Sequence, residues 1–158
     1  RPQHILRHLL QGENVIYTDV DIAWRMNPIK YFHDLDGKMD LMAQIDYTYS
    51  TGLPCYCTGF MAILSNPRNI QLMELWATKL APKPTYNQNL FNDAVQELTP
   101  KNGLQHRGLD RTKFPSGKQY FEQYDKATKE KVVVVHNNFI AGHDAKKKRF
   151  QDAGLWLL

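Results

Sequence analysis

The sequence predicts a single α/β domain. Short apolar runs rich in β-branched residues alternate with longer segments of helical periodicity, a pattern typical of that class. The chain has 158 residues, of which 42% are hydrophobic and 23% charged, enough for one globular domain with a core. It opens on Arg1 and enters a helical pattern at once. We therefore expect one domain over residues 1–158 that is truncated at its N-terminus.

The composition argues against several other classes of protein. The net charge is +4, but much of the basic excess lies in the run 146–149, and no nucleic-acid-binding motif accompanies it. We therefore expect no nucleic-acid partner. No apolar stretch approaches the roughly 20 residues that a membrane span needs, so no span is expected within this chain. Cys55 and Cys57 are separated by one residue, which suits neither a mutual disulfide nor a zinc site.

The first helix and strand lead to a pair of acidic residues. Apolar residues recur at helical spacing at Ile5, Leu6, Leu9 and Leu10. Gly12 is expected to end this helix. The run 15–17 is β-branched and aromatic, and it predicts a short buried strand that ends at Thr18 or Asp19. That strand would place Asp19 and Asp21 at the edge of a sheet.

Further strands and helices complete the predicted domain. Strands are expected at 41–45, 60–64 and 132–135, and the first and last of these run into Asp46 and His136. One helix starts at the Asn66-Pro67 cap, with a buried face formed by Ile70, Met73, Ala77 and Leu80. A second helix follows Asn87, with a buried face formed by Leu90, Phe91, Ala94, Val95 and Leu98. The tail from Asp144 predicts a last helix that closes near Gly154, and Trp24 and Trp156 are expected in the core.

Asp19 and Asp21 are the first candidates for chemistry. Residues two apart in an extended segment point to the same side, so the two carboxylates can act together at the end of the strand. Carboxylates suit Mg or Mn, which complete their coordination with water and substrate phosphates. The spacing alone has little weight, because Asp34 and Asp36 repeat it. A turn with two solvated acids is the alternative interpretation.

His136 and the loop after it form a second candidate group. His136 follows an apolar run, as Asp19 does, and neutral imidazole can serve as a third ligand for Mn. Asn138, Gly142 and Lys146 then offer an amide, a flexible backbone position and a cation, a combination that can hold a diphosphate. The alternative is a histidine with a structural hydrogen bond. Three of the four residues in 146–149 are expected to be solvated.

Four segments of the chain carry a resemblance to a known family. They are VIYTDVDIAWRMNPIKYF (15–32), CTGFMAI (57–63), YNQNLFNDAV (86–95) and HNNFIAGHDAKKKRFQDAGLWL (136–157). Together they resemble the nucleotide-diphospho-sugar transferases, GT-A fold glycosyltransferases that include plant cell-wall xylosyl- and arabinosyltransferases. The segments occur in the family's order and span most of the chain. The resemblance implies a GT-A-like fold, a mixed sheet flanked by helices, of which this chain would be the C-terminal portion.

The resemblance also implies roles for the charged candidates. Asp19 and Asp21 would be the D-x-D pair that binds Mn or Mg and the donor diphosphate, with His136 as the third metal ligand. Lys146 matches the lysine that neutralises the leaving phosphate. The family commonly has Asp-Gln where this chain has Asn87-Gln88.

By the same resemblance, Gln88 would lie near the anomeric carbon of the donor sugar, so Gln88 and Asp21 are the candidate catalytic residues. Asn87 would contact the sugar hydroxyls without a carboxylate. A polar helix cap is the alternative for Asn87 and Gln88.

A sugar pocket is expected around Thr58, Gly59 and Phe60. Glycine would allow close approach of a sugar ring, and phenylalanine would offer a stacking surface. Asp46, at the end of another strand, is a candidate for acceptor contact. The alternatives are a turn at Gly59 and a cap at Asp46.

The implied chemistry is transfer of a sugar from a nucleotide-diphosphate donor, UDP by family precedent, to a hydroxyl of a glycan or glycoprotein. Related enzymes retain the anomeric configuration. No convincing carboxylate nucleophile is visible, so we expect front-side attack assisted by the leaving phosphate. An anchor helix in the missing N-terminus would indicate the Golgi lumen.

Two other functions compete with sugar transfer. An inactive transferase-like carbohydrate-binding module is favoured by Asn87 and by the absence of an N-terminal half. A haloacid-dehalogenase-type phosphatase would use Asp19 as nucleophile and Asp21 as acid/base. Ala23 argues against the phosphatase, since that family expects Thr or Val at this position.

Overall fold

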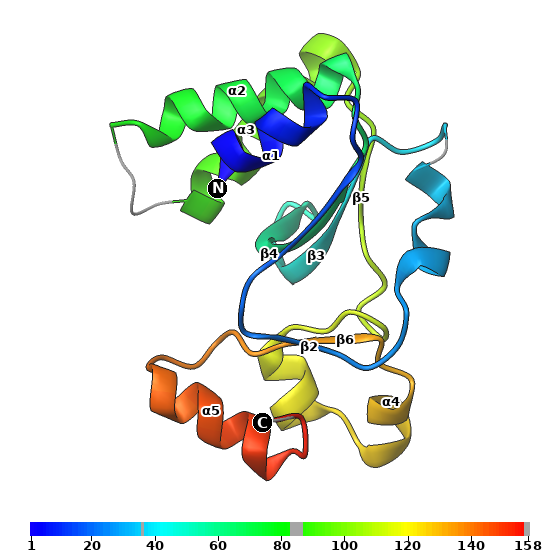
Figure 1. The fold of residues 1–158 in the computed structure, drawn as a ribbon, viewed down its shortest axis with the longest axis vertical. Coiled ribbons are helices and arrows are strands. Elements are labelled where there is room, and N and C mark those ends of the chain that lie inside the picture. Colours follow the sequence, from blue (N-terminus) through cyan, green and yellow to red (C-terminus); the bar gives the residue numbers. More distant parts are fainter. Residues whose placement is uncertain (36, 83–86, 157–158) are drawn as a thin grey trace.

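The computed structural model describes residues 1–35, 37–82 and 87–156, which form layers stacked along the long axis of the molecule (Figure 1). The first layer consists of the helices α1 (Pro2–Leu9), α2 (Pro67–Leu80) and α3 (Asn87–Asn102). The second is a sheet of β1 (Val15–Thr18), β3 (Leu41–Thr48), β4 (Pro54–Ile63) and β5 (His106–Gly108). The third is a sheet of β2 (Ile22–Trp24) and β6 (Val134–His136). The last contains α4 (Lys126–Glu130), α5 (His143–Asp152) and the π-helical turn η3 (Gln119–Gln123).

The larger sheet is mixed, as the family resemblance implies. Its strand order is β1-β4-β3-β5, with β1 and β3 antiparallel to β4 and with β5 parallel to β3. The short helices η1 (Ile29–Tyr31) and η2 (His33–Leu35) lead from β2 back to this sheet. The strand β1 is only half-buried, although a buried strand is expected there. It lies at the edge of the sheet and has a single neighbouring strand.

The helices of the first layer bury their apolar faces against one side of the larger sheet. As predicted, Asn66 caps α2, and its side chain accepts from the Asn69 N–H at 2.9 Å. Helix α3 likewise buries the predicted Phe91. In α2 the buried face includes Trp76, which is not part of the predicted stripe. Trp76 packs edge to face on Phe91, with ring centroids 4.8 Å apart. Of the predicted stripe, Ile70, Ala77 and Leu80 are only partly buried.

An aromatic cluster covers the opposite side of the sheet and corrects two expectations. Phe60 is fully buried and stacks on Phe114, with ring centroids 5.5 Å apart. The prediction that Phe60 offers a stacking surface to a sugar is therefore wrong. Trp24 meets the edge of Phe60 at 5.7 Å but leaves 47% of its surface exposed, so its assignment to the core is wrong as well. Trp156 packs partly buried beside Phe150, under the smaller sheet.

Several element boundaries differ from the sequence prediction. Helix α1 ends at Leu9, which leaves Leu10 64% exposed outside the apolar face. The strand expected at 60–64 begins at Pro54, a residue that tolerates the start of a strand because it has no N–H to pair. The last helix agrees well, since α5 begins at His143 and Gly154 follows with φ +66°. Asp36, Tyr86 and Leu157, which occur in the sequence motifs, lie outside the described residues.

Two irregularities in the pairing of β3 with β4 shape the space beside the sheet. Ala43 pairs with Met61, and Ile45 pairs with Tyr56, so β3 advances by two residues where β4 advances by five. Residues 57–60 of β4 therefore bulge away from β3. Between Ile45 and Tyr47, β3 instead has the additional residue, because these two pair with the adjacent Tyr56 and Cys55. Such bulges bend strands and re-aim side chains, and they are frequent beside active sites.

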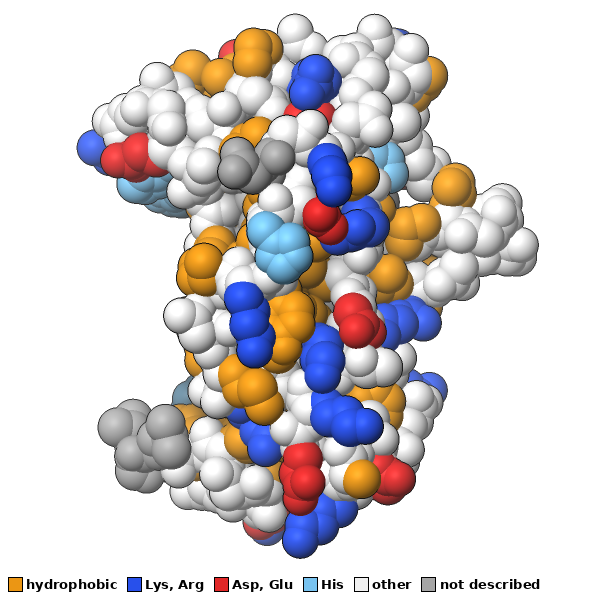
Figure 2. Space-filling view, turned by 90° about the vertical axis from the view of Figure 1, so that its right-hand side faces the viewer, with side chains coloured by type: hydrophobic (Ala, Val, Ile, Leu, Met, Phe, Trp, Pro, Cys, Tyr) orange, Lys and Arg blue, Asp and Glu red, His pale blue; other side chains and the backbone are white. Residues whose placement is uncertain are grey.

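Charge is spread over the surface of the molecule. Figure 2 shows the face that lies on the right in Figure 1, where basic side chains are interspersed with acidic and hydrophobic ones. Exposed ion pairs of the molecule include Arg107 with Asp34 and Lys101 with Glu97. Across the part of the chain that the structure describes, no helix combines the length and the apolar character that crossing a membrane requires.

Candidate active site

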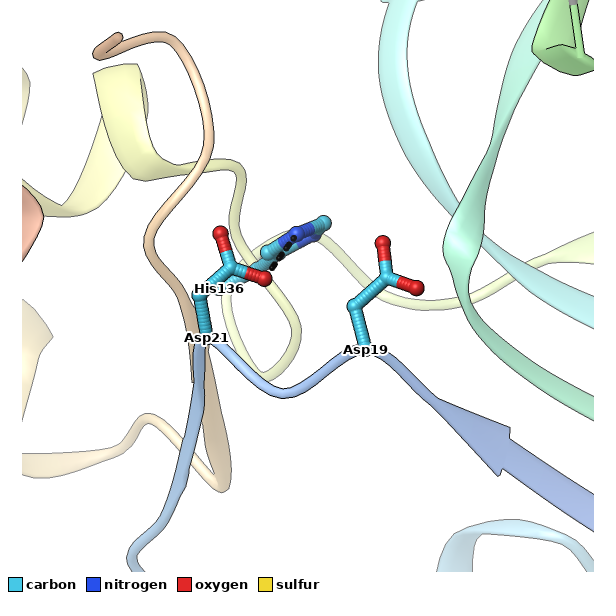
Figure 3. A group of neighbouring side chains, drawn as sticks. All are labelled: Asp19, Asp21 and His136. Atoms are coloured by element: carbon cyan, nitrogen blue, oxygen red, sulfur yellow. Dashed lines mark ion pairs between the residues drawn. The ribbon is translucent and has the colours of Figure 1, made fainter. Parts of the chain in front are cut away.

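Asp19, Asp21 and His136 meet where the two sheets adjoin (Figure 3). Asp19 directly follows β1, Asp21 directly precedes β2, and His136 ends β6, where it pairs with Ile22. One ligand atom of each of these residues lies within 4.8 Å of the others. His136 Nε2 is 3.5 Å from Asp21 Oδ1. The structure thus brings together the three predicted metal ligands from distant parts of the sequence.

A glycine provides the room in which these groups meet. Gly59 lies within β4, not in the turn considered as its alternative role, and its carbonyl accepts from the Asp19 N–H at 2.8 Å. A Cβ atom at this position would lie 2.3 Å from His136 Cε1 and 2.9 Å from Asp19 Oδ2, too close for either. The space kept open by Gly59 is bordered by two carboxylates and one imidazole, a ligand set that suits Mn or Mg. These residues therefore fit a divalent cation.

Gln44 fixes the orientation of the histidine. It is fully buried in β3, and its Nε2 donates to the Pro115 carbonyl at 2.5 Å. Its Oε1 is therefore left to accept from His136 Nδ1, at 2.7 Å. Because Nδ1 is committed to Gln44, Nε2 is the ring nitrogen that faces Asp21 and is left available to a metal ion.

Two basic side chains compensate the acidic pair. Lys146 Nζ contacts Asp21 Oδ2 at 2.5 Å, and Arg1 Nη2 contacts Asp19 Oδ1 at 2.7 Å. A hydrogen bond from His136, opposed by burial and reinforced by Lys146, holds the pKa of Asp21 well below its usual range. Asp21 is therefore ionised at neutral pH. Arg1 also donates to the Thr58 hydroxyl at 2.6 Å.

A pocket of about 410 Å³ extends from the metal-ligand group toward the start of α3. At its far end, Asp46 is held by two amides. Its Oδ2 accepts from Gln88 Nε2 at 2.9 Å, and its Oδ1 accepts from Asn138 Nδ2 at 2.8 Å. Gln88 in turn accepts from the Thr58 N–H at 3.3 Å. Asn87 and Gly59 also line this pocket, so most of the predicted sugar-site residues surround one space.

A second cavity, of about 710 Å³, lies on the other side of the acidic pair. Asp19, Asp21 and Lys146 line both cavities, whereas Gly142 lines only the second and Asn138 only the first. The sequence analysis places Asn138, Gly142 and Lys146 in one diphosphate-binding loop. The structure separates them, because the chain between 138 and 142 crosses from one cavity to the other.

The sequence analysis missed three residues of the site. Gln44 carries the one available signal, a polar residue at an inward position of an apolar strand. Arg1 stands at the start of the chain and carries no signal. Arg149 is expected on a solvated face, but its Nε donates to Asn137 Oδ1 at 2.7 Å and its Nη2 to the Asn138 carbonyl at 2.6 Å. Its guanidinium also lies 4.2 Å from the centre of the Phe121 ring.

Comparison with known proteins identifies the family. A family model described as nucleotide-diphospho-sugar transferase matches residues 1–150, a range that includes all the site residues named above. The chain belongs to this family. The resemblance stated from the four sequence segments is thereby confirmed, and so is the GT-A-like fold class, since the structure is a mixed sheet flanked by helices.

Similar proteins in this family are named as sugar transferases. The chain is 35% identical to UDP-D-xylose:L-fucose alpha-1,3-D-xylosyltransferase 3 of Arabidopsis thaliana, over 100% of this chain and 46% of the relative. It is 29% identical to UDP-galactose:fucoside alpha-3-galactosyltransferase of Dictyostelium discoideum, over 100% of this chain and 27% of that protein. The chain is also 29% identical to a beta-arabinofuranosyltransferase of Arabidopsis thaliana, over 96% of this chain and 32% of that protein. The chain spans less than half the length of these relatives.

Proposed function

We propose that the protein transfers a sugar from a UDP-sugar to a hydroxyl of a fucose-containing glycan, with the help of a divalent cation. The observation that carries the proposal is the meeting of Asp19, Asp21 and His136 at one end of a pocket whose other end holds Asp46 and Gln88. The relatives from Arabidopsis and Dictyostelium support fucose as the acceptor, since their names share fucose or a fucoside while their donor sugars differ.

The end of the pocket with the metal ligands suits the donor diphosphate. A Mn or Mg ion held by Asp19, Asp21 and His136 would supply positive charge to the departing nucleoside diphosphate. Lys146 Nζ, now 2.5 Å from Asp21, is placed to add a second positive charge to the leaving phosphate. Stabilisation of the leaving group is therefore the main contribution of this end.

The opposite end of the pocket suits the two sugars. Gln88 is fixed by Asp46 and by the Thr58 N–H, so its amide is held in a single orientation toward the donor sugar. Asp46 then orients the acceptor hydroxyl. Because an amide is a poor nucleophile, we propose front-side attack with retention of configuration. Mass spectrometry after incubation with the donor tests this mechanism. A sugar covalently bound to Asp46 would contradict front-side attack and indicate a double displacement.

Turnover with a panel of UDP-sugars tests the proposed function. In the presence of Mn and methyl α-L-fucoside, we expect release of UDP and a glycosylated fucoside with at least one donor. EDTA and the variants Asp19→Asn and Asp21→Asn should abolish turnover. Asp34→Asn is the matched control, because Asp34 starts the second D-x-D spacing but pairs with Arg107 away from the pocket. Full activity of Asp21→Asn would contradict the proposal.

A transferase-like protein that binds sugars without transferring them is the second candidate. Asn87 favours it, since this residue stands where the family commonly has an acid. Calorimetry with UDP and Mn, followed by the turnover assay, distinguishes the two, because an inactive module would bind and release no UDP from a donor. The family match argues against the phosphatase considered from the sequence.

A further inference from the structure

Two tyrosines on the β3–β4 hairpin have no part in the chemistry described so far. Tyr47 and Tyr49 pack edge to face, with ring centroids 5.3 Å apart. The Tyr49 hydroxyl donates to Cys55 Sγ at 3.3 Å, which fixes its ring. Tyr47 leaves 45% of its surface exposed. An exposed aromatic ring that is held by an anchored neighbour offers a preformed contact surface.

The bulge in β3 puts Tyr47 on the same side of the sheet as Asp46. Asp46 is the extra residue between Ile45, which pairs with Tyr56, and Tyr47, which pairs with Cys55. Directly paired residues share a side of the sheet, so Tyr47 and Cys55 face the same way. Tyr47 therefore lies on the side that Asp46 faces, and the usual alternation of side chains is broken here.

Cys55 connects the tyrosines with the far end of the pocket. Its Sγ contacts the Tyr49 hydroxyl on one side and lies 4.0 Å from Gln88 Nε2 on the other. Gln88 holds Asp46 at 2.9 Å. Cys55 thus links the aromatic pair to Gln88 and Asp46, which line the end of the pocket opposite the metal ligands, the end assigned to the acceptor.

We propose that Tyr47 and Tyr49 form an acceptor subsite for the apolar edge of a 6-deoxyhexose. The proposal rests on the proposed function, in which a fucose accepts the sugar. Fucose carries a methyl group at C6 where common hexoses carry a hydroxymethyl group, so one edge of its ring is apolar. That edge and the adjoining C–H groups fit against the tyrosine rings, while Asp46 accepts a hydrogen bond from a hydroxyl.

A comparison of two acceptors tests the subsite. Methyl α-L-fucoside and methyl α-L-galactoside differ only in the hydroxyl on C6. We expect the wild-type protein to prefer the fucoside, and Tyr47→Ala to raise the KM for the fucoside about tenfold, an effect on the order of one lost aromatic contact. The preference over the galactoside should shrink in parallel, and the KM for the donor should stay within about twofold.

Two control variants separate the ring from other effects of mutation. Tyr47→Phe keeps the ring and should retain the wild-type KM and the preference for the fucoside. Leu53→Ala changes another exposed side chain on the same hairpin, 48% exposed, and should alter neither KM. If Tyr47→Ala does not fold, Tyr47→Leu replaces it, since a leucine keeps apolar contact without an aromatic face and should weaken the preference less.

The outcomes distinguish the subsite from the function on which it rests. An unchanged KM and preference in a folded Tyr47→Ala variant that still binds Mn would overturn the subsite alone. Transfer by the wild-type protein to other sugars but to no fucoside would overturn the proposed acceptor, and the subsite with it. Equal use of the two acceptors by the wild-type protein would also overturn the subsite.

Discussion

Gly59 sets how closely the metal-binding side chains can approach one another. We expect Gly59→Ala to weaken Mn binding by more than tenfold. The added Cβ would lie 2.3 Å from His136 Cε1 and 2.9 Å from Asp19 Oδ2, so both side chains would have to move. Isothermal titration with Mn measures the effect. Gly108→Ala is the matched control, since its Cβ would meet the Ile45 side chain at 2.1 Å and lower stability away from the metal ligands. Equal Mn affinity in Gly59→Ala and wild type would show that the metal binds elsewhere.

Gln44 would act on a bound metal ion through the histidine. Replacing it by leucine removes the acceptor that holds His136 Nδ1 at 2.7 Å, and we expect metal affinity to fall about 10- to 100-fold. Gln44→Glu keeps an acceptor oxygen and should recover part of the affinity. The Mn electron paramagnetic resonance spectrum should broaden in the leucine variant if the ligand geometry loosens. An unaltered spectrum and affinity would leave Gln44 with a packing role only.

Single residues were predictable from the sequence where the local pattern carries the information. Asp19 and His136 each follow an apolar run, so their place at the end of a strand could be inferred. Phe60 could not be placed correctly, because the sequence does not show which side of β4 faces the helices and which faces the aromatic cluster. Gln44 and Arg149 act through partners about 90 and 12 positions away, respectively, and no local pattern records such contacts.

Among the elements, the junction of β3, α2 and β5 depends on one buried acid. Asp40 accepts from Arg68 Nε and Nη2, both at 2.7 Å, and from the Gln105 N–H at 2.8 Å. We expect Asp40→Asn to lower the free energy of unfolding by about 2 kcal/mol, below the range for fully buried pairs because Arg68 is partly exposed. Urea unfolding measures it. Asp34→Asn, which breaks an exposed pair, should have little effect.

The lowered pKa of Asp40 predicts that the free energy of unfolding depends on pH. Burial acts to raise the pKa of Asp40, but the hydrogen bonds from Arg68 and the Gln105 N–H outweigh it, and the pKa is lowered. A lowered pKa in the folded state gives stability that is present above the unfolded value of about 3.9 and lost as the pH falls through the folded pKa. The difference in unfolding free energy between wild type and Asp40→Asn should therefore be constant near pH 7 and shrink below about pH 4. A constant difference down to pH 2 would contradict this assignment.

Arg149 tests whether helix α5 positions the loop beside the pocket. Arg149→Met keeps most of the side chain over Phe121 but removes the donors to Asn137 and the Asn138 carbonyl. Because Asn138 then loses support for its bond to Asp46, we expect a raised acceptor KM with Mn affinity nearly unchanged. Lys148→Met on the same helix is the control, since Lys148 pairs with Asp152 on the exposed side. A loss of Mn affinity without a change in KM would assign Arg149 to the metal instead.

Elements were predicted well when helical periodicity or a cap defined them. The Asn66 cap, the buried face of α3 and the end of α5 near Gly154 all follow from local sequence, and the structure confirms them. Strands were harder to predict from the sequence. The β4 segment 55–59 has no β-branched apolar residue and contains glycine, so its pattern did not predict a strand, yet it is buried beside the irregular pairing of β3 with β4. Local composition does not predict bulges.

At the scale of the whole molecule, the three candidate metal ligands join two sheets. Asp19 follows a strand of the larger sheet, while Asp21 and His136 adjoin the smaller one. A ligand that binds only the folded state stabilises it, by about 2.7 kcal/mol at 100 times its dissociation constant. We expect Mn at that concentration to raise the melting temperature of the wild type by about 5–10 °C. Asp21→Asn should lose this shift and Asp34→Asn should keep it; a shift of equal size in both would indicate non-specific binding.

The meeting of Asp19 with His136 could not be derived from periodicity. The two residues are separated by 117 positions, from 19 to 136, and their proximity depends on the antiparallel pairing of β2 with β6. Only the family resemblance indicated that both belong to one site. The order of the strands in the larger sheet, β1-β4-β3-β5, is a second long-range property that the sequence pattern does not predict.

The small sheet of β2 and β6 also has a consequence for how the chain matures. Its two strands lie far apart in the sequence, since Trp24 pairs with Val134, 110 positions later, so a chain emerging from the ribosome cannot form this sheet until β6 has been made. The earlier layers can pack first, yet they would contain only one of the three cation ligands. Capture of a cation by all three side chains would thus have to wait until His136 has been made and β6 has paired with β2.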